Sequence, residues 1–427
     1  MRYKNQVVFF ILILAESLLL TVWRGKTGVY LSPLLIFFIS LSVGMFPLFF
    51  RSEKFSPTKE KSSILLIINI ISLISLTILI LFLFAAIFRK NPVNPALSDI
   101  IPTVDILSHR LLAGEDPYQL ITEYGYHIPP TYLPFQWLPF VISSFFGFGH
   151  RWIPVVFWLI SLLFYEIYVF NSIKSELPRF LASLLPLLIL LIFVLDFPQM
   201  FAVSIELLPA AYYILFGLSL LSSNIFLKSF AVTLPLLSRF SFVVWLPVWF
   251  VSLLKTEKIR KLLLFAGIAM MVILSVYILP FLSKRPATLI DGMKYYTISA
   301  LGEWMPKDYQ KAGEKPVHLF RGVGFACYFY DFYPGSIRNR LSALKKTQLS
   351  LVILTSLILI FFVLRKKKPD CLSLYLLSSL KIYLTVFYAF IQVPYVYLQL
   401  VPVFISAILF SGYLTIHGSN TKIISDA

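Results

Sequence analysis

Residues 64–88 read ILLIINIISLISLTILILFLFAAIF, a long run without a single charged side chain. About 20 largely apolar residues suffice for a helix to cross the hydrocarbon core of a bilayer, and similar runs recur at 262–281 and 347–364. Of the 427 residues in the chain, 59% are hydrophobic and only 13% are charged, about half the charged share of an ordinary soluble domain. These runs lack the polar face that a helix on the surface of a soluble protein shows. The sequence therefore predicts an all-α protein that crosses a membrane many times.

The apolar runs predict about twelve membrane helices in a single domain that covers residues 1–427. Two long segments, 89–131 and 284–346, interrupt the series and are expected to form external loops. One predicted helix contains Pro235, Arg239 and Pro247, so we expect it to break into two half-helices. The predicted helices are 7–24, 29–50, 64–88, 132–149, 152–170, 180–196, 203–223, 229–254, 262–283, 347–364, 371–390 and 394–416.

Basic residues gather in short clusters between the apolar runs, at Arg51–Lys61, Lys255–Lys261 and Arg365–Lys368. Such clusters mark the cytoplasmic side of membrane proteins. This rule places both termini inside and the two long segments outside. It also explains the net charge of +17 without nucleic acid, because no solvated basic groove with stacking aromatic residues is visible. Membrane lipids are the expected surroundings of the chain.

The first long segment concentrates acids and histidines between very apolar helices. It reads DIIPTVDILSHRLLAGEDPY from Asp99 to Tyr118, and YGYHIPP follows from Tyr124 to Pro130. The apolar spacing within 103–113 predicts a short amphipathic helix on the membrane surface. Asp105 and His109 are four residues apart, so they share one face of that helix. Partial desolvation raises the pKa of a carboxyl group, which suits it for general-base catalysis.

This pattern resembles the first external loop of the GT-C class of glycosyltransferases. An acid, then Gly-Glu-Asp-Pro-Tyr, then a Pro-Pro pair before a helix is closest to the bacterial branch that uses polyprenyl-phosphate-mannose. The close resemblance is confined to about 99–140; family members usually show Tyr-Pro-Pro, whereas this chain has His127-Ile128-Pro129-Pro130.

The resemblance implies an inverting hexosyltransferase, with mannose as the guess for the sugar. Its donor would be a polyprenyl-phosphate-linked sugar, and its acceptor a hydroxyl of a cell-envelope glycan or lipid. It also implies location in the inner (plasma) membrane with the active site on the external face. Asp105 would be the base that deprotonates the acceptor.

Further side chains are candidates for binding the substrates. For Glu115 and Asp116 the favoured interpretation is that they only solvate a loop. Lys381 lies in the middle of an apolar run, where a cation is costly unless it is paired or functional. Arg321 is a candidate for the phosphate, and Glu303 with Trp304 for the sugar. The full set of predicted substrate-binding residues is His109, Glu115, Asp116, Tyr118, Tyr126, Glu303, Trp304, Arg321 and Lys381.

The sequence predicts neither a metal site nor another cofactor. Cys327 and Cys371 form no CxxC or Cys/His cluster, and the predicted topology puts them on opposite sides of the membrane, so no disulfide is expected. A divalent cation held by carboxylates from separate loops stays an open alternative.

Three other classes of protein compete with the transferase. A secondary transporter also has about twelve helices, but it usually shows two related halves, and no internal repeat is visible here. An envelope polysaccharide polymerase or ligase would use Arg and His in a large late loop, where His318 and Arg321 lie. A non-catalytic scaffold is the remaining class.

Overall fold

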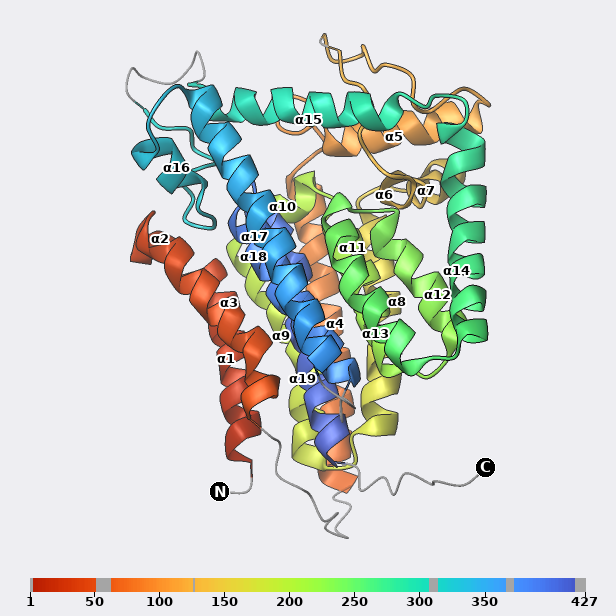
Figure 1. Cartoon of the computed structure of the whole chain (residues 1–427), viewed down its shortest axis with the longest axis vertical. Helices are drawn as coiled ribbons and strands as arrows, with labels where there is room; N and C mark the ends of the chain where they lie inside the picture. The colour runs from red at the N-terminus through yellow and green to blue at the C-terminus, as the bar shows by residue number, and fades with distance from the viewer. Residues whose placement is uncertain (1–2, 51–62, 126, 307–313, 366–371, 419–427) are drawn as a thin grey trace.

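The computed structural model describes residues 3–50, 63–125, 127–306, 314–365 and 372–418, and the regular secondary structure in these parts is helical (Figure 1). Eight helices in them are long and apolar enough to cross a membrane. The polytopic all-α prediction is confirmed at this level. The eight are α3 (Leu31–Phe49), α4 (Ser63–Lys90), α8 (Trp152–Ser172), α9 (Glu176–Asp196), α14 with its π-helical continuation (Ile259–Leu282), α17 (Ile337–Arg365), α18 (Leu372–Ala389) and the span Val396–Thr415, most of which is α19 (Leu400–Gly418).

The predicted break in 229–254 is confirmed. α11 (Leu207–Leu221) is followed by α12 (Ile225–Leu236), which ends one residue after Pro235. The chain then turns through Arg239 into a 3-10 helix (Phe240–Trp245) and α13 (Leu246–Thr256). A proline removes a backbone donor and clashes with the preceding turn, which accounts for two half-helices in place of one span.

In two other ranges the structure differs from what the sequence led us to expect. Residues 132–149 form two short helices, α6 (Pro134–Trp137) and α7 (Phe140–Phe146), because a proline opens or precedes each of them. The segment 284–346 is not a simple loop. It contains α15 (Thr288–Trp304) and α16 (Ala326–Phe332), and its end is the first part of α17, which begins at Ile337.

Two helices lie across one end of the bundle. They are α5 (Ile100–Leu112) and α15, and both run roughly perpendicular to the long helices (Figure 1). α1 (Lys4–Leu20) begins, and α19 ends, at the opposite end of the bundle. The connection between α13 and α14 and the C-terminal end of α17, which carry basic residues, lie toward that opposite end as well. The expected surface helix in the first long segment is therefore present, and α5 ends before Gly114, which has a φ of 74°.

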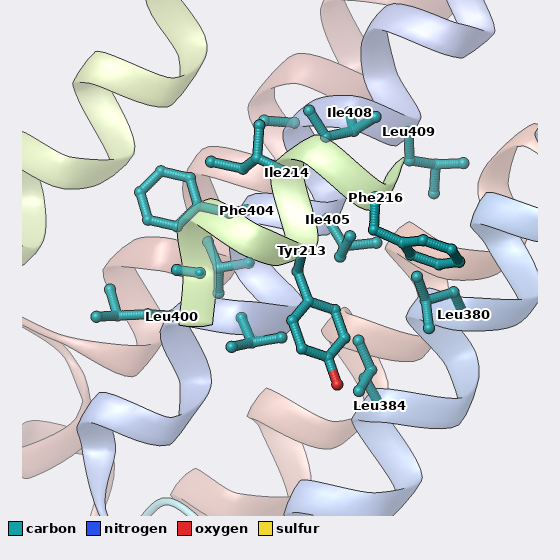
Figure 2. Close-up of a cluster of buried hydrophobic side chains, with 14 of the residues drawn as sticks. Tyr213, Ile214, Phe216, Leu380, Leu384, Leu400, Phe404, Ile405, Ile408 and Leu409 are labelled. Carbon is teal, nitrogen blue, oxygen red and sulfur yellow. The ribbon is translucent and has the colours of Figure 1, made fainter. Parts of the chain in front are cut away.

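The core of the bundle is packed by α11, α18 and α19. Figure 2 shows Phe216 of α11 facing Leu380 of α18, with Ile405 and Leu409 of α19 beside them. All four side chains are fully buried. Close packing of this kind holds the bundle as a rigid support for the elements at its end.

Candidate active site under two surface helices

Asp105 lies in a group of polar side chains on one flank of α5. Its Oδ1 is 2.5 Å from His150 Nε2 and 3.2 Å from His109 Nε2. His150 Nδ1 lies 2.7 Å from Ser143 Oγ, so α5 is tied to α7 and to the start of α8. The predicted pairing of Asp105 with His109 on one face is confirmed. His150 was not predicted, since it is 45 residues away along the chain.

The surroundings of Asp105 lower its pKa, whereas partial desolvation was expected to raise it. The hydrogen bond from His150 lowers the pKa of Asp105, and it outweighs the partial burial that would raise it. A carboxylate with a lowered pKa is a weaker proton acceptor. The order Ser143, His150, Asp105 is also that of a hydrolase triad, but Ser143 is fully buried and donates to the Phe140 carbonyl at 2.8 Å, so it does not meet a substrate.

Most of the other predicted residues of the first long segment have structural roles. Tyr118 is 5% exposed; its hydroxyl donates to the Tyr132 carbonyl at 2.9 Å and accepts from Trp137 Nε1 at 3.0 Å. It therefore has no free hydroxyl for a ligand, contrary to the prediction. Asp116 pairs with Arg285, and Glu115 is exposed. Tyr126 lies outside the described residues.

Trp304 does not offer a ring face to a sugar. Its side chain is 0% exposed, and its Nε1 donates to the Gln392 carbonyl at 2.8 Å. This prediction is therefore wrong, because α15 turns Trp304 into a core contact with the turn before α19. The neighbouring Glu303 stays partly exposed, with its Oε2 3.7 Å from His318 Nε2.

Lys381 is likewise not available to a phosphate. Its Nζ lies 2.5 Å from Glu16 Oε1 and 3.0 Å from the Pro402 carbonyl oxygen. Ser406 Oγ donates to the other oxygen of Glu16 at 3.0 Å. Lys381 and Glu16 are 0% and 1% exposed. The prediction of a substrate contact is replaced by an intramembrane ion pair that joins α1 to α18 and α19.

A second polar group forms at the break between α12 and the following 3-10 helix. Arg239 forms an ion pair with Glu206, which directly precedes α11, and their side chains are 19% and 6% exposed. Within the described residues, Glu206 Oε2 and Arg239 Nε are buried without hydrogen-bond partners. The pair thus keeps bonding capacity that a ligand could use.

Both ends of the first long segment dock beside this pair. At the start of α5, Ser98 Oγ donates to the Val203 carbonyl at 3.0 Å, three residues before Glu206. At the other end, the Phe135 amide donates to the Leu237 carbonyl at 2.9 Å, two residues before Arg239. These hydrogen bonds hold the stretches that carry Asp99 and Tyr132 against the segments that carry Glu206 and Arg239.

The charge of Asp99 also acts on tyrosines of this second group. Burial raises the pKa of Tyr132, the carboxylates of Asp99 and Glu206 raise it further, and Arg239 lowers it. Burial also raises the pKa of Tyr395, and Glu303 and Asp99 are among the charges that add to the effect. Asp99 itself is partly exposed. Its charge therefore acts on two tyrosines of the group, Tyr132 and Tyr395.

Tyr296 of α15 also interacts electrostatically with this group. Burial raises its pKa to about 12, and the positive charge of Arg239 lowers it. Its side chain is 45% exposed. The rings of Tyr395 and Tyr397 stack with their centroids 4.9 Å apart. We call Asp99, Tyr132, Glu206, Arg239, Tyr296, Tyr395 and Tyr397 the central cluster.

Among the described residues, no group of three or more His, Cys, Asp or Glu side chains could hold a metal ion. Cys327 is buried as a free thiol, and Cys371 lies outside the described residues. Comparison with protein-family models, curated proteins and solved structures found no match for this chain.

Proposed function

We propose that the chain is a membrane glycosyltransferase that moves a hexose from a polyprenyl-phosphate carrier to a hydroxyl acceptor at the central cluster. The observation that supports this most is the combination, under two surface helices, of an arginine with unused bonding capacity and the partly exposed carboxylate of Asp99. An arginine can stabilise a departing phosphate, and a carboxylate can take a proton from a hydroxyl. The cluster lies at the end of the bundle away from the basic connections, which supports an external site.

In this proposal Asp99, not Asp105, is the general base. It takes the proton of the acceptor hydroxyl while the hydroxyl oxygen attacks the anomeric carbon. The bond between that carbon and the phosphate oxygen breaks, and the phosphate leaves with the bonding electrons. Arg239 balances the charge of the leaving phosphate, with Glu206 holding the guanidinium in place. Attack opposite to the leaving group inverts the anomeric centre.

Asp105 then has a different role. Its hydrogen bond to His150 joins α5 to the start of α8, so it fixes the surface helix over the site. The tyrosines of the central cluster supply ring faces and hydroxyl groups to the sugar, since a tyrosine side chain combines an apolar body with a polar tip.

A transfer assay tests the function itself. The purified protein is reconstituted in vesicles with radiolabelled polyprenyl-phosphate mannose and a lipid extract as the source of acceptors. We expect label to move from the carrier to a new product, and an Arg239→Lys variant to be slower. Uptake of a substrate into the vesicles without any transfer would show a transporter instead. Lengthening of a glycan that depends on His318 would show a polymerase.

A further inference from the structure

A pair of arginines lies beside the central cluster and is not explained by it. Arg24 belongs to α2 (Arg24–Thr27), the short turn between α1 and α3. Its guanidinium stacks over the ring of Phe197, 4.6 Å from the centroid. Its Nη1 is buried and has no hydrogen-bond partner within the described residues. A buried guanidinium nitrogen normally has an acceptor, so a ligand oxygen is the natural candidate here.

The second arginine is brought next to the first by the backbone. Gly322 has a φ of 73°, and a Cβ there would lie 3.2 Å from Arg24 Cγ and 3.2 Å from Ser32. Ser32 Oγ donates to the Gly322 carbonyl at 2.7 Å. Only a glycine fits this approach without strain. The contact sets the exposed side chain of Arg321 beside Arg24.

The two guanidinium groups have little compensating charge among the described residues. Burial and the nearby charge of Arg321 lower the pKa of Arg24 to about 10, and Asp196 offsets this only in part. Among the described residues, no ion pair to a carboxylate forms at Arg24 or Arg321. Two like charges held side by side with only partial compensation favour an anion between them.

The position of the pair indicates a lipid rather than a soluble anion. Val22 and Trp23, just before Arg24, are each 42% exposed, and Leu195, two residues before Phe197, is 64% exposed. Apolar side chains exposed at the end of a membrane helix mark the boundary between lipid tails and headgroups. We propose that Arg24 and Arg321 bind the phosphate of an anionic lipid headgroup at this boundary.

The bound lipid would be the acceptor, a step that rests on the proposed function. The backbone links the two sites: Phe197, under Arg24, directly precedes the short helix α10 (Pro198–Val203), and the Val203 carbonyl at its end accepts the hydrogen bond of Ser98, next to Asp99. A headgroup phosphate held by the two arginines would therefore leave the rest of the headgroup near Asp99. The acceptor class is then a phospholipid whose headgroup carries free hydroxyl groups.

Lipid binding by the purified full-length chain tests the site without any sugar transfer. Fluorescent short-chain phosphatidylglycerol and phosphatidylcholine are titrated into detergent-solubilised protein, with inorganic phosphate as a competitor. We expect the anionic lipid to bind at least tenfold more tightly than the zwitterionic one. We expect Arg24→Gln and Arg321→Gln each to reduce that affinity at least tenfold. Lys26→Gln is the control, since Lys26 is exposed on the same turn.

The outcomes separate the parts of the proposal. Unchanged affinity in both arginine variants, with melting temperatures equal to wild type, would overturn the site. Displacement of the lipid by equimolar inorganic phosphate would keep the anion site but overturn the lipid assignment. Arg321→Lys keeps the charge and should retain part of the affinity. A complete loss of binding in this variant would therefore indicate a folding defect. Intact lipid binding in a protein that shows no transfer would refute the proposed function and leave this site standing.

Discussion

The ion pair between Glu16 and Lys381 gives a quantitative test of the fold. Replacing Lys381 by Met leaves a buried carboxylate whose remaining partner, among the described residues, is the Ser406 hydroxyl. Replacing Glu16 by Gln leaves a buried ammonium with the Pro402 carbonyl. Removing one partner of a buried ion pair costs about 3–5 kcal/mol of stability. At ~1.4 kcal/mol per tenfold change, this shifts the unfolding equilibrium by a factor of about 10²–10³ or more. Removing both charges together is often close to neutral. We therefore expect each single variant to be strongly destabilised and the Glu16→Gln/Lys381→Met double variant to recover most of the loss.

The assay is reversible unfolding in mixed micelles, followed by circular dichroism as the fraction of denaturing detergent rises. Lys294→Met is the control, because Lys294 is 71% exposed on α15 and should shift the midpoint little. A double-mutant cycle measures the coupling between Glu16 and Lys381 directly. Single variants within about 0.5 kcal/mol of wild type, or effects that simply add in the double variant, would refute the role of this pair.

Two further predictions concern the elements that hold the site. Because its hydrogen bond to His150 lowers the pKa of Asp105, the stability from this contact is present above the ordinary carboxyl pKa of about 4 and is lost as the pH falls through the lowered value. The acid-induced drop in melting temperature should therefore be smaller in His150→Gln, and an unchanged pH profile would contradict this. A Cβ at Gly324 would lie 2.8 Å from Pro394 Cβ and 3.0 Å from the Ala389 carbonyl, so Gly324→Ala should lower the melting temperature by several degrees. In the matched variant Gly292→Ala the nearest atom is an ordinary 3.7 Å away, and an equal loss there would contradict the steric reason.

Local features of the fold were predictable from the sequence because their causes are local. Apolar runs set the long helices, Pro235 and Pro247 indicated the broken span, and Asp105 with His109 followed from helical spacing. The two short helices in 132–149 were missed although Pro134 and Pro139 are visible there, since hydropathy alone favoured one span.

The site itself depended on contacts between distant parts of the chain. Asp99 is brought toward Glu206 because Ser98 docks on the Val203 carbonyl, while Phe135 docks on Leu237 at the half-helix break. Trp304 and Lys381 stood out in the sequence for their residue type, but burial and partners assigned them to packing and to an ion pair. Arg24 was not predicted as a binding residue, because its role depends on the close approach of Gly322, which is distant in the sequence.

The rate of sugar transfer by Asp99→Asn, compared with Asp105→Asn under single-turnover conditions, is the most direct test of where the chemistry occurs. Removing a general base typically costs about 10²–10⁴-fold in rate. We predict a loss of that size for Asp99→Asn at unchanged melting temperature, and for Asp105→Asn a loss of less than about tenfold together with lower stability. An Asp99→Asn enzyme as fast as wild type, or a folded Asp105→Asn enzyme without activity, would contradict the assignment of the central cluster.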